Sequence, residues 1–271
     1  MTRIVGIIPA RMGSSRFPGK PMQPIAGIPM IGHVFMRARM SDTLDEVYVA
    51  TCDAEICHYI ESLGGQAIMT RDTHVRCGDR VAEALLEVER MTGARVDIVV
   101  LIQGDEPLVQ PGMINEAVDP LLDDNEIQIV NLMGHIKDAQ EWSDPNQVKV
   151  VVDRRNFALY FSRAPIPCNQ KWDGSVPMNK QICVIPHRRD ILLRFSELPS
   201  TPLERIESVD MMRLLEHGYK VKMVPTRFEV CSVDTPADLE RAEAIMKADP
   251  LFAEYRNRRA TEHRSTPARA P

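Results

Sequence analysis

The stretch that decides the fold lies near the start of the chain and reads Ile7-Ile8-Pro9-Ala10-Arg11-Met12-Gly13-Ser14-Ser15-Arg16-Phe17-Pro18-Gly19-Lys20-Pro21. It begins as an apolar strand, breaks at Pro9, and continues as a loop rich in cations, glycine and serine. The glycines can turn backbone N–H groups inward, where no Cβ blocks the approach of an anion. Arg11, Arg16 and Lys20 add positive charge beside these amides, so the loop is suited to bind a polyphosphate.

The spacing of this loop excludes two common nucleotide-binding motifs. A Walker A loop reads G-x-x-x-x-G-K-[ST], whereas here five residues separate Gly13 from Gly19, and Pro21 replaces the hydroxyl residue that binds magnesium. The dinucleotide fingerprint G-x-G-x-x-G is missing from the loop as well. A solvated basic turn is the plainer interpretation, but the position directly after a first apolar strand favours a ligand loop.

The bulk composition narrows the class of protein. The chain has 271 residues, 44% of them hydrophobic, which is enough for one large α/β domain or two small ones. Its net charge of −5 argues against a general nucleic-acid or membrane-surface binder. No apolar run approaches the ~20 residues of a membrane span and no signal peptide is evident, so we expect a cytoplasmic protein. The cysteines are scattered without a C-x-x-C pair, which indicates reduced thiols rather than a metal site.

Strand and helix patterns alternate along the first half of the chain, as is typical of βαβ units. The run Asp97 to Ile102 is continuously apolar after its first residue, as expected for a central strand that helices cover on both faces. We therefore predict an α/β fold with a mainly parallel central sheet and helices on both faces. The expected strands are 4–8, 46–51, 66–70, 97–102, 127–133, 182–185 and 219–224, and the expected helices are 31–38, 54–63, 79–91, 111–122, 188–195, 202–215 and 236–246.

The alternation of strand and helix patterns stops after residue 147. Runs 148–152 and 157–161 flank the turn Asp153-Arg154-Arg155-Asn156 and predict a β-hairpin. We expect residues 148–187 to form an insert that acts as a lid, a subunit contact or both. Residues 249–271 are basic and lack periodicity, so we expect a disordered tail after a main domain of residues 1–248.

Two acidic turns end β-like runs. Gln103-Gly104-Asp105-Glu106-Pro107 follows the apolar strand, and Val233-Asp234-Thr235-Pro236 starts the last helix with Thr235 as its N-cap. Ligands of open α/β sheets bind at the carboxyl ends of the strands, so Asp105 and Asp234 could converge on one crevice. The plainer alternatives are a turn aspartate at position 105 and a helix-capping acid at position 234.

Taken together, these segments resemble the 3-deoxy-manno-octulosonate (KDO) cytidylyltransferases over roughly residues 3–246. The motifs that carry the resemblance are the first loop, QGDEP at 103–107, ALYFSRAPIP at 158–167, TPLE at 201–204 and VDTPADLE at 233–240. Any one of them is weak evidence, but the set is specific. The resemblance implies a Rossmann-like nucleotidyltransferase fold, a homodimer, and the coupling of CTP to a sugar acid with release of pyrophosphate.

The resemblance also implies roles for individual residues. The expected CTP-binding residues are Arg11, Ser14, Arg16, Lys20, Arg76, Gly78 and Gly104, the expected Mg²⁺ ligands are Asp105 and Asp234, and the expected catalytic residues are Arg11, Lys20, Asp105 and Asp234. CTP brings about four negative charges, which metal and cations must offset before an anionic acceptor can approach the α-phosphorus. The anomeric hydroxyl of the acceptor then attacks in line while pyrophosphate leaves along the first loop.

Two segments depart from the family pattern. Where family members carry H-x-S-G-T-x-R, this chain has His74-Val75-Arg76-Cys77-Gly78-Asp79-Arg80, and where they carry H-L-G-I-Y-G-Y it has Gln181-Ile182-Cys183-Val184-Ile185-Pro186-His187. Asp210-Met211 likewise stands in place of Glu-Gln. We expect the acceptor to contact Arg80, Gln103, Gln181, His187 and Asp210. Because unpaired buried groups are costly, the changes favour an altered anionic acceptor, such as a modified KDO, a sialic-type acid or a phosphonate.

A sensor that binds nucleotide or sugar acid without catalysis is the competing hypothesis from another class. Such a sensor has little need for two metal-binding carboxylates, so the presence of both Asp105 and Asp234 beside the cationic loop favours an enzyme. The expected partners are CTP and an anionic small molecule, with no nucleic acid and no membrane.

Overall fold

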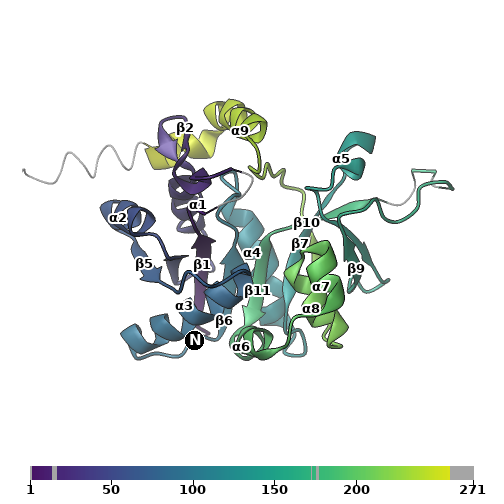
Figure 1. Cartoon of the computed structure of the whole chain (residues 1–271), viewed down its shortest axis with the longest axis horizontal. Helices are drawn as coiled ribbons and strands as arrows, with labels where there is room; N and C mark the ends of the chain where they lie inside the picture. Colours follow the sequence, from purple (N-terminus) through teal and green to yellow (C-terminus); the bar gives the residue numbers. More distant parts are fainter. Residues whose placement is uncertain (1, 14–16, 172, 175–176, 257–271) are drawn as a thin grey trace, which may run out of the picture.

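The computed structural model describes residues 2–13, 17–171, 173–174 and 177–256, which form two five-stranded β-sheets with helices around them (Figure 1). The first sheet has the order β11-β6-β1-β4-β5. Its strands are β1 (Ile4–Ala10), β4 (Glu46–Thr51), β5 (Gln66–Met69), β6 (Ile98–Ile102) and β11 (Val184–Arg188). Neighbouring strands run parallel except for β11, which is antiparallel to β6. The predicted mainly parallel central sheet is therefore confirmed.

The central strands of this sheet carry apolar side chains on both faces, so both faces are covered by helices. Every residue of β1 and β6 is buried, and successive residues of β6 pack into opposite hydrophobic clusters. Helices α3 (Cys77–Thr92) and α6 (Arg189–Glu197) cover one face. Helices α1 (Met30–Ala38), α2 (Ala54–Ser62) and α4 (Pro111–Asp123) cover the other. The expected arrangement of helices on both faces is confirmed.

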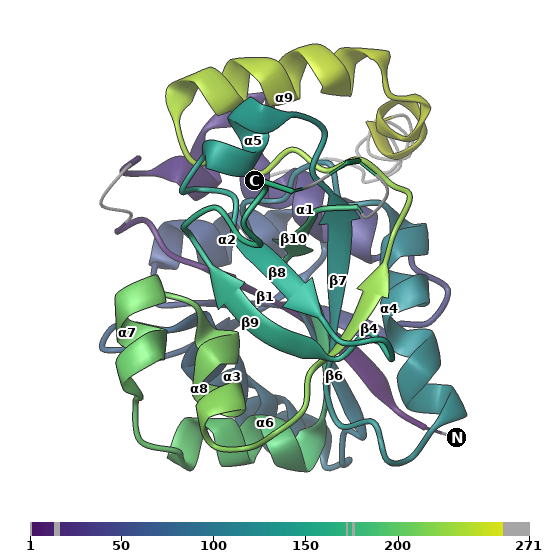
Figure 2. The same cartoon turned by 90° about the vertical axis from the view of Figure 1, so that its right-hand side faces the viewer.

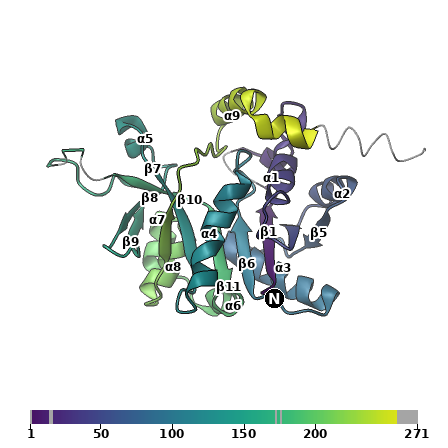
Figure 3. The same ribbon diagram turned by 180° about the vertical axis from the view of Figure 1, so that it is seen from behind.

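The second sheet has the order β12-β7-β10-β8-β9 and faces the viewer in Figure 2. Its strands are β7 (Val130–His135), β8 (Lys149–Val152), β9 (Ala158–Ser162), β10 (Asn179–Ile182) and β12 (Lys222–Pro225). The predicted hairpin exists as the antiparallel pair β8 and β9. It is not a self-contained insert, because β7 and β12 belong to the same sheet and lie outside residues 148–187. Helix α4 contacts β7 of the second sheet and β11 of the first, and it lies on the near side of the molecule in Figure 3.

The segment predicted as one strand, 182–185, is divided between the two sheets. Strand β10 ends at Ile182 and pairs with β7, whereas β11 starts at Val184 and pairs with β6. Between them, the carbonyl of Cys183 accepts a hydrogen bond from the Gln103 backbone N–H at 3.0 Å. The single-strand prediction is wrong because one residue at this point belongs to neither ladder. The crossing places the altered segment 181–187 beside the end of the central strand.

The helix predicted over residues 202–215 is also divided. Helix α7 (Pro202–Glu207) and helix α8 (Asp210–Glu216) are separated by Ser208 and Val209, and the φ of Ser208, 53°, is left-handed. The Arg163 side chain donates hydrogen bonds to the carbonyls of Glu207 and Ser208, which cannot continue a helical ladder. The break turns the N-terminus of α8 toward α3.

The last predicted helix is present as α9 (Pro236–Ala248), and Thr235 caps it as expected. The expected disorder from residue 249 onward is wrong for residues 249–256. Residues 250–256 are helical, and Phe252 and Tyr255 are buried against residues of β2 (Pro24–Ile25), β3 (Ile28–Pro29) and α1. The burial of two aromatic side chains outweighs the polar composition of the segment. The remainder of the predicted tail, 257–271, lies outside the described residues.

Short elements complete the chain. They are the 3-10 turn η1 (Lys20–Met22), the strands β2 (Pro24–Ile25) and β3 (Ile28–Pro29), and helix α5 (Ala139–Ser143). Among the residues that the structure describes, no helix combines the length and apolar character needed to cross a bilayer.

Replacing Phe252 with alanine is expected to lower the free energy of unfolding by about 3 kcal/mol, because it leaves a cavity in a buried cluster. Urea denaturation followed by circular dichroism measures this loss. The control, Lys247→Ala on the exposed side of α9, should cost less than about 0.5 kcal/mol. A Phe252→Ala protein as stable as the control contradicts the packing of the C-terminal segment.

Candidate active site

Lys20 lies between the two aspartates that the sequence singled out. Its ammonium donates to Asp105 Oδ2 at 2.8 Å and to Asp234 Oδ1 at 3.2 Å. The Val233 N–H donates to the carbonyl of Asp105 at 2.9 Å, which joins the two acidic turns through their backbones. The predicted convergence of Asp105 and Asp234 is therefore observed: both carboxylates touch one cation.

The cluster is largely shielded from solvent. The side chains of Lys20, Asp105 and Asp234 are 12%, 20% and 19% exposed. Burial alone would lower the pKa of Lys20, but the two neighbouring carboxylates outweigh burial and raise that pKa above its usual value. Lys20 therefore stays charged at neutral pH, and the cluster carries more negative than positive charge.

The first loop is fastened at both of its described ends. The Met12 N–H donates to Asp53 Oδ2 at 2.8 Å, and the Gly19 N–H donates to the Met12 carbonyl at 3.0 Å. Gly19 has a φ of 71°, a left-handed conformation that glycine adopts without strain and that turns the chain into η1. Arg11 is exposed, and Ser14 and Arg16 lie outside the described residues.

Two cavities meet at Asp105. The larger, of about 320 Å³, lies between the two sheets at the end of β6, and we call it the acceptor-side cavity. The smaller, of about 210 Å³, lies along the first loop, and we call it the loop-side cavity. The predicted residues that line the acceptor-side cavity are Arg76, Gly78, Gln103, Asp105, Gln181, His187, Asp210 and Asp234. Those that line the loop-side cavity are Arg11, Lys20, Arg76, Arg80, Gln103, Gly104 and Asp105.

Two of the predicted glycines are required by close packing. A Cβ on Gly104 would lie 2.8 Å from the Pro9 carbonyl oxygen, so only glycine lets this turn approach the end of β1. A Cβ on Gly78 would lie 2.5 Å from the ring of Phe195. Both glycines therefore bring backbone to the edge of a cavity.

Arg80 does not lie with the other residues that we expected to bind the acceptor. It is buried at the loop-side cavity, where its Nη1 donates to Thr70. Among the described residues, nothing hydrogen-bonds its Nη2. Arg80 therefore adds its charge on the same side as Arg11 and Lys20.

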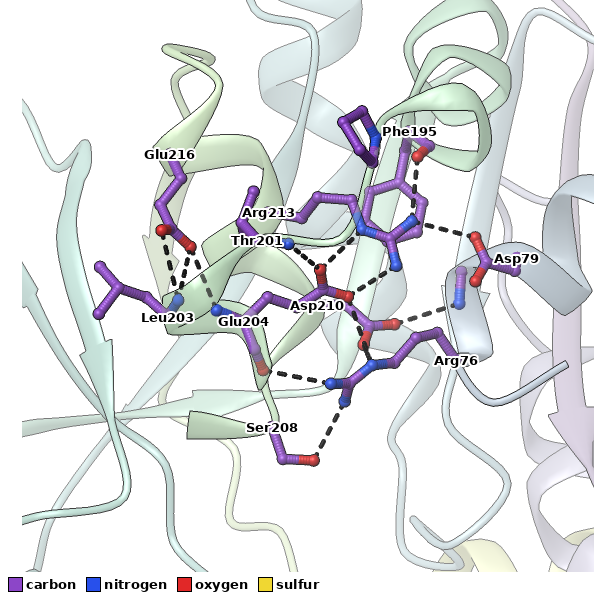
Figure 4. A network of polar contacts seen from close by, with 12 residues as sticks. Arg76, Asp79, Phe195, Thr201, Leu203, Glu204, Ser208, Asp210, Arg213 and Glu216 are labelled. Carbon is purple, nitrogen blue, oxygen red and sulfur yellow. Dashed lines mark hydrogen bonds and ion pairs between the residues drawn. The ribbon is translucent and has the colours of Figure 1, made fainter. Parts of the chain in front are cut away.

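Arg76, which stands in place of the family serine, belongs to an ionic network that joins α3 to α7 and α8 (Figure 4). Its Nε lies 3.3 Å from Glu204 Oε1 and 3.6 Å from Asp210 Oδ1, and its Nη1 donates to Ser208 at 3.0 Å. Glu204 is fully buried and also receives two hydrogen bonds from Arg213, at 2.6 and 2.9 Å. The positive charge of Arg76 is therefore paired mainly with carboxylates of the protein itself.

The same network orients Asp210. The Gly78 N–H donates to Asp210 Oδ2 at 3.2 Å, across the gap between α3 and α8. Burial raises the pKa of Asp210, while Arg76 and this hydrogen bond act in the opposite direction. Asp210 thus presents a half-buried carboxyl group, held by Arg76 and Gly78, to the acceptor-side cavity.

The sequence alone does not indicate the roles of Glu204 and Arg213. The only signal was the T-x-x-E pattern at Thr201 and Glu204, which the structure uses as a capping box. Glu106 was missed as well, although it lies within QGDEP. Burial and then Asp105 raise the pKa of Glu106 to about 8, so this buried residue of the acceptor-side cavity is mainly protonated at neutral pH.

Gln181 and His187 both reach the acceptor-side cavity, from β10 and β11. Gln181 Nε2 donates to Asn131 Oδ1 at 2.6 Å. His187 Nδ1 lies 2.8 Å from the Ile185 carbonyl, which can only accept, so Nδ1 carries a proton. Burial lowers the pKa of His187 to about 4, and its Nε2 is therefore a hydrogen-bond acceptor at neutral pH.

The comparisons with known proteins agree with this geometry. A cytidylyltransferase family profile matches residues 5–223. Proteins called 3-deoxy-manno-octulosonate cytidylyltransferase in Geobacter metallireducens and Syntrophotalea carbinolica are 41% and 42% identical to this chain. The matches cover 88% and 90% of this chain and 96% and 98% of the two relatives. The chain belongs to the 3-deoxy-manno-octulosonate cytidylyltransferase family.

Solved structures of the family and of more distant proteins share the fold. A CMP:2-keto-3-deoxy-manno-octonic acid synthetase complexed with CTP matches with a TM-score of 0.82 at 38% identity, over 91% of this chain and 99% of that one. A cytidylyltransferase from Leptospira borgpetersenii matches over the full length of both chains with a TM-score of 0.61 at 16% identity, which shows the fold alone. The predicted Rossmann-like nucleotidyltransferase fold and the prediction of an enzyme, rather than a sensor, are confirmed.

His187 is expected to make stability depend on pH. Because its pKa is about 4 when folded and 6.5 in the unfolded chain, the unfolded state binds the proton first as the pH falls. The contribution, about 3 kcal/mol, is complete above pH 6.5 and is lost between pH 6.5 and 4. His187→Asn keeps a donor for the Ile185 carbonyl but cannot titrate, so its unfolding free energy should fall less over this range. Urea melts at pH 7 and pH 4.5 test this, and equal losses in both proteins contradict it.

Proposed function

We propose that this protein transfers CMP from CTP to 3-deoxy-manno-octulosonate and releases pyrophosphate. The observation that carries the proposal is the position of Asp105, which lines both the cationic loop-side cavity and the acceptor-side cavity. The relatives bear the name of this activity, and the similar solved structure is a complex with CTP. We place the reaction in the cytoplasm because CTP is its donor.

The loop-side cavity suits the nucleotide. Arg11, Lys20 and Arg80 contribute three positive charges to its lining, and the Gly104 turn brings backbone close to the same space. These groups can hold the triphosphate and stabilise the charge that develops on the departing pyrophosphate. Catalysis then rests on positioning and on charge, without a histidine as general base.

Asp105 and Asp234 are the residues that we propose as Mg²⁺ ligands. Magnesium is commonly held by one or two carboxylates together with substrate phosphates, so a pair of converging aspartates fits it. The fact that both aspartates already contact one cation supports this use. Within the described part of the chain, no group of three or more His, Cys, Asp or Glu side chains offers a cage formed by protein alone. When bound, the ion would neutralise phosphate charge and lower the pKa of a coordinated hydroxyl.

A second candidate is the same reaction with a related anionic acceptor. It is favoured by Arg76, whose guanidinium is held by Glu204 and Asp210 where the family pattern has a serine. It is favoured also by Gln181, whose amide donates to Asn131 where the pattern has a histidine. A modified KDO, a sialic-type acid or a phosphonate would make different hydrogen bonds at these positions.

Pyrophosphate release from CTP across a panel of sugar acids and phosphonates tests the function. We expect turnover with CTP that needs Mg²⁺, and the acid with the highest kcat/KM identifies the acceptor. Asp105→Asn should lower kcat by 100-fold or more, an estimate on the order of the loss of one transition-state contact. The control, Asp72→Asn at an exposed position that lines neither cavity, should keep normal turnover. Preference for ATP or for a sugar 1-phosphate contradicts the proposal.

We also propose that the protein is a homodimer that associates through the outer edge of the second sheet. Strand β9 is at the edge of that sheet and exposes Leu159, which is 62% accessible. Glu207 of α7 accepts hydrogen bonds from Tyr160 and Ser162 of β9, so α7 belongs to the same end of the molecule (Figure 2). Its neighbour Ile206 is 76% accessible. Large exposed apolar side chains beside the edge strand of a sheet favour association with a second copy.

Light scattering after size-exclusion chromatography tests this association. We expect twice the chain mass for the natural protein and the mass of one chain for Leu159→Asp or Ile206→Asp, because each variant would bury a charge in the interface. Leu122→Asp, at an exposed leucine of α4, is the matched control and should remain a dimer. A natural protein with the mass of one chain, or dimers in both edge variants, contradicts the proposed interface.

A further inference from the structure

The ammonium of Lys20 stands in the place that a divalent cation needs. It contacts one oxygen of Asp105 and one of Asp234, the same two carboxylates that we propose as Mg²⁺ ligands. The Lys20 Nζ lies 2.8 Å from Asp105 Oδ2 and 3.2 Å from Asp234 Oδ1, so both carboxylates contact the same positive charge. An ion bound to both carboxylates would therefore lie within a few ångströms of this ammonium, and the two cations would repel each other.

The backbone position of Lys20 is fixed by the fold. Its backbone follows the left-handed Gly19 and starts the turn η1, where the Gln23 N–H donates to the Lys20 carbonyl at 3.1 Å. Pro21 is the next residue and is buried. The side chain is only 12% exposed, so this ion pair is better shielded from water than the pairs common on protein surfaces. The fold therefore places the Lys20 backbone beside the two carboxylates, and without nucleotide its ammonium pairs with them.

We infer that Lys20 occupies the cation position of the nucleotide-free enzyme and makes divalent-cation binding depend on the arrival of a triphosphate. The inference rests on the proposed Mg²⁺ site. Lys20 also lines the loop-side cavity, so its flexible side chain can reach phosphate oxygens placed there. A triphosphate brings about four negative charges, enough to attract the ammonium and the ion together. Lys20 then contacts phosphate, and the two carboxylates accept the ion.

This exchange links two binding events. If CTP draws Lys20 away from the carboxylates, CTP tightens the binding of the ion, and by thermodynamic linkage the ion tightens the binding of CTP by the same factor. Without nucleotide, the ion must compete with an ammonium that is part of the folded structure. Lys20 is thus a positioning residue for the metal as well as a ligand of the phosphates.

Binding of Mn²⁺, followed by electron paramagnetic resonance without any nucleotide, tests the inference. Lys20→Met keeps most of the side-chain length but removes the charge, so it should bind Mn²⁺ about tenfold more tightly than the natural protein. The matched control is Lys180→Met, which removes another buried lysine, paired with Glu141 outside the aspartate pair. It should leave Mn²⁺ affinity unchanged. Equal affinity in Lys20→Met and the natural protein, or an equal gain in the control, overturns the inference.

Two further readouts do not depend on catalysis. In the natural protein, CTP without acceptor should tighten Mn²⁺ binding at least tenfold, and this coupling should shrink in Lys20→Met. The thermal midpoint of Lys20→Met should be lowered by repulsion between the aspartates and recovered by millimolar Mg²⁺ but not by equal ionic strength of NaCl. A natural protein that binds Mn²⁺ equally well with and without CTP overturns the inference, even if Lys20→Met does not fold. Failure of the proposed function is a separate result, because it appears only in pyrophosphate release.

Discussion

The arrangement of the site depends on one ionic interaction, the contact of the Lys20 ammonium with both Asp105 and Asp234. It joins three segments that are far apart in the chain: the turn after the first loop, the turn after β6 and the N-terminus of α9. Without a cation, two converging carboxylates would repel each other in a partly buried setting. The packing of the C-terminal segment supports this contact, because Phe252 and Val233 belong to one buried cluster beside Asp234.

The two cavities divide the chemistry of the site. The loop-side cavity is cationic and is built by the first sheet, whose strands end at the first loop and at the Gly104 turn. The acceptor-side cavity is built where the first sheet meets the second sheet and α8, and it presents Asp210, Glu106 and the neutral His187. Its walls are held by carboxylate and arginine pairs within the protein. In this family, changes in the residues of the acceptor-side cavity can therefore alter the acceptor without any change in the loop-side cavity.

Much of the fold was predictable because the segments that form the first sheet have unambiguous patterns. The apolar run ending at Ile102, the amphipathic helices and the Thr235 cap each have a local cause, and the structure has them where they were expected. The errors have physical causes as well. The crossing at Cys183 and the break at Ser208 depend on hydrogen bonds from distant residues, Gln103 and Arg163. Residues 249–256 are ordered because they pack on a hydrophobic surface formed by α1, β2 and β3.

The sequence by itself determined the type of fold, the cationic first loop, the two acidic turns and the resemblance to a family, because each of these is written in neighbouring residues. Only the tertiary structure decided which side chains meet. It placed Arg80 with the cations of the first loop, engaged Arg76 with Glu204 and Asp210, and set Lys20 between the aspartates. The physical reason is that ion pairs and hydrogen bonds depend on distances of a few ångströms, and residues far apart in the chain reach such distances only through packing.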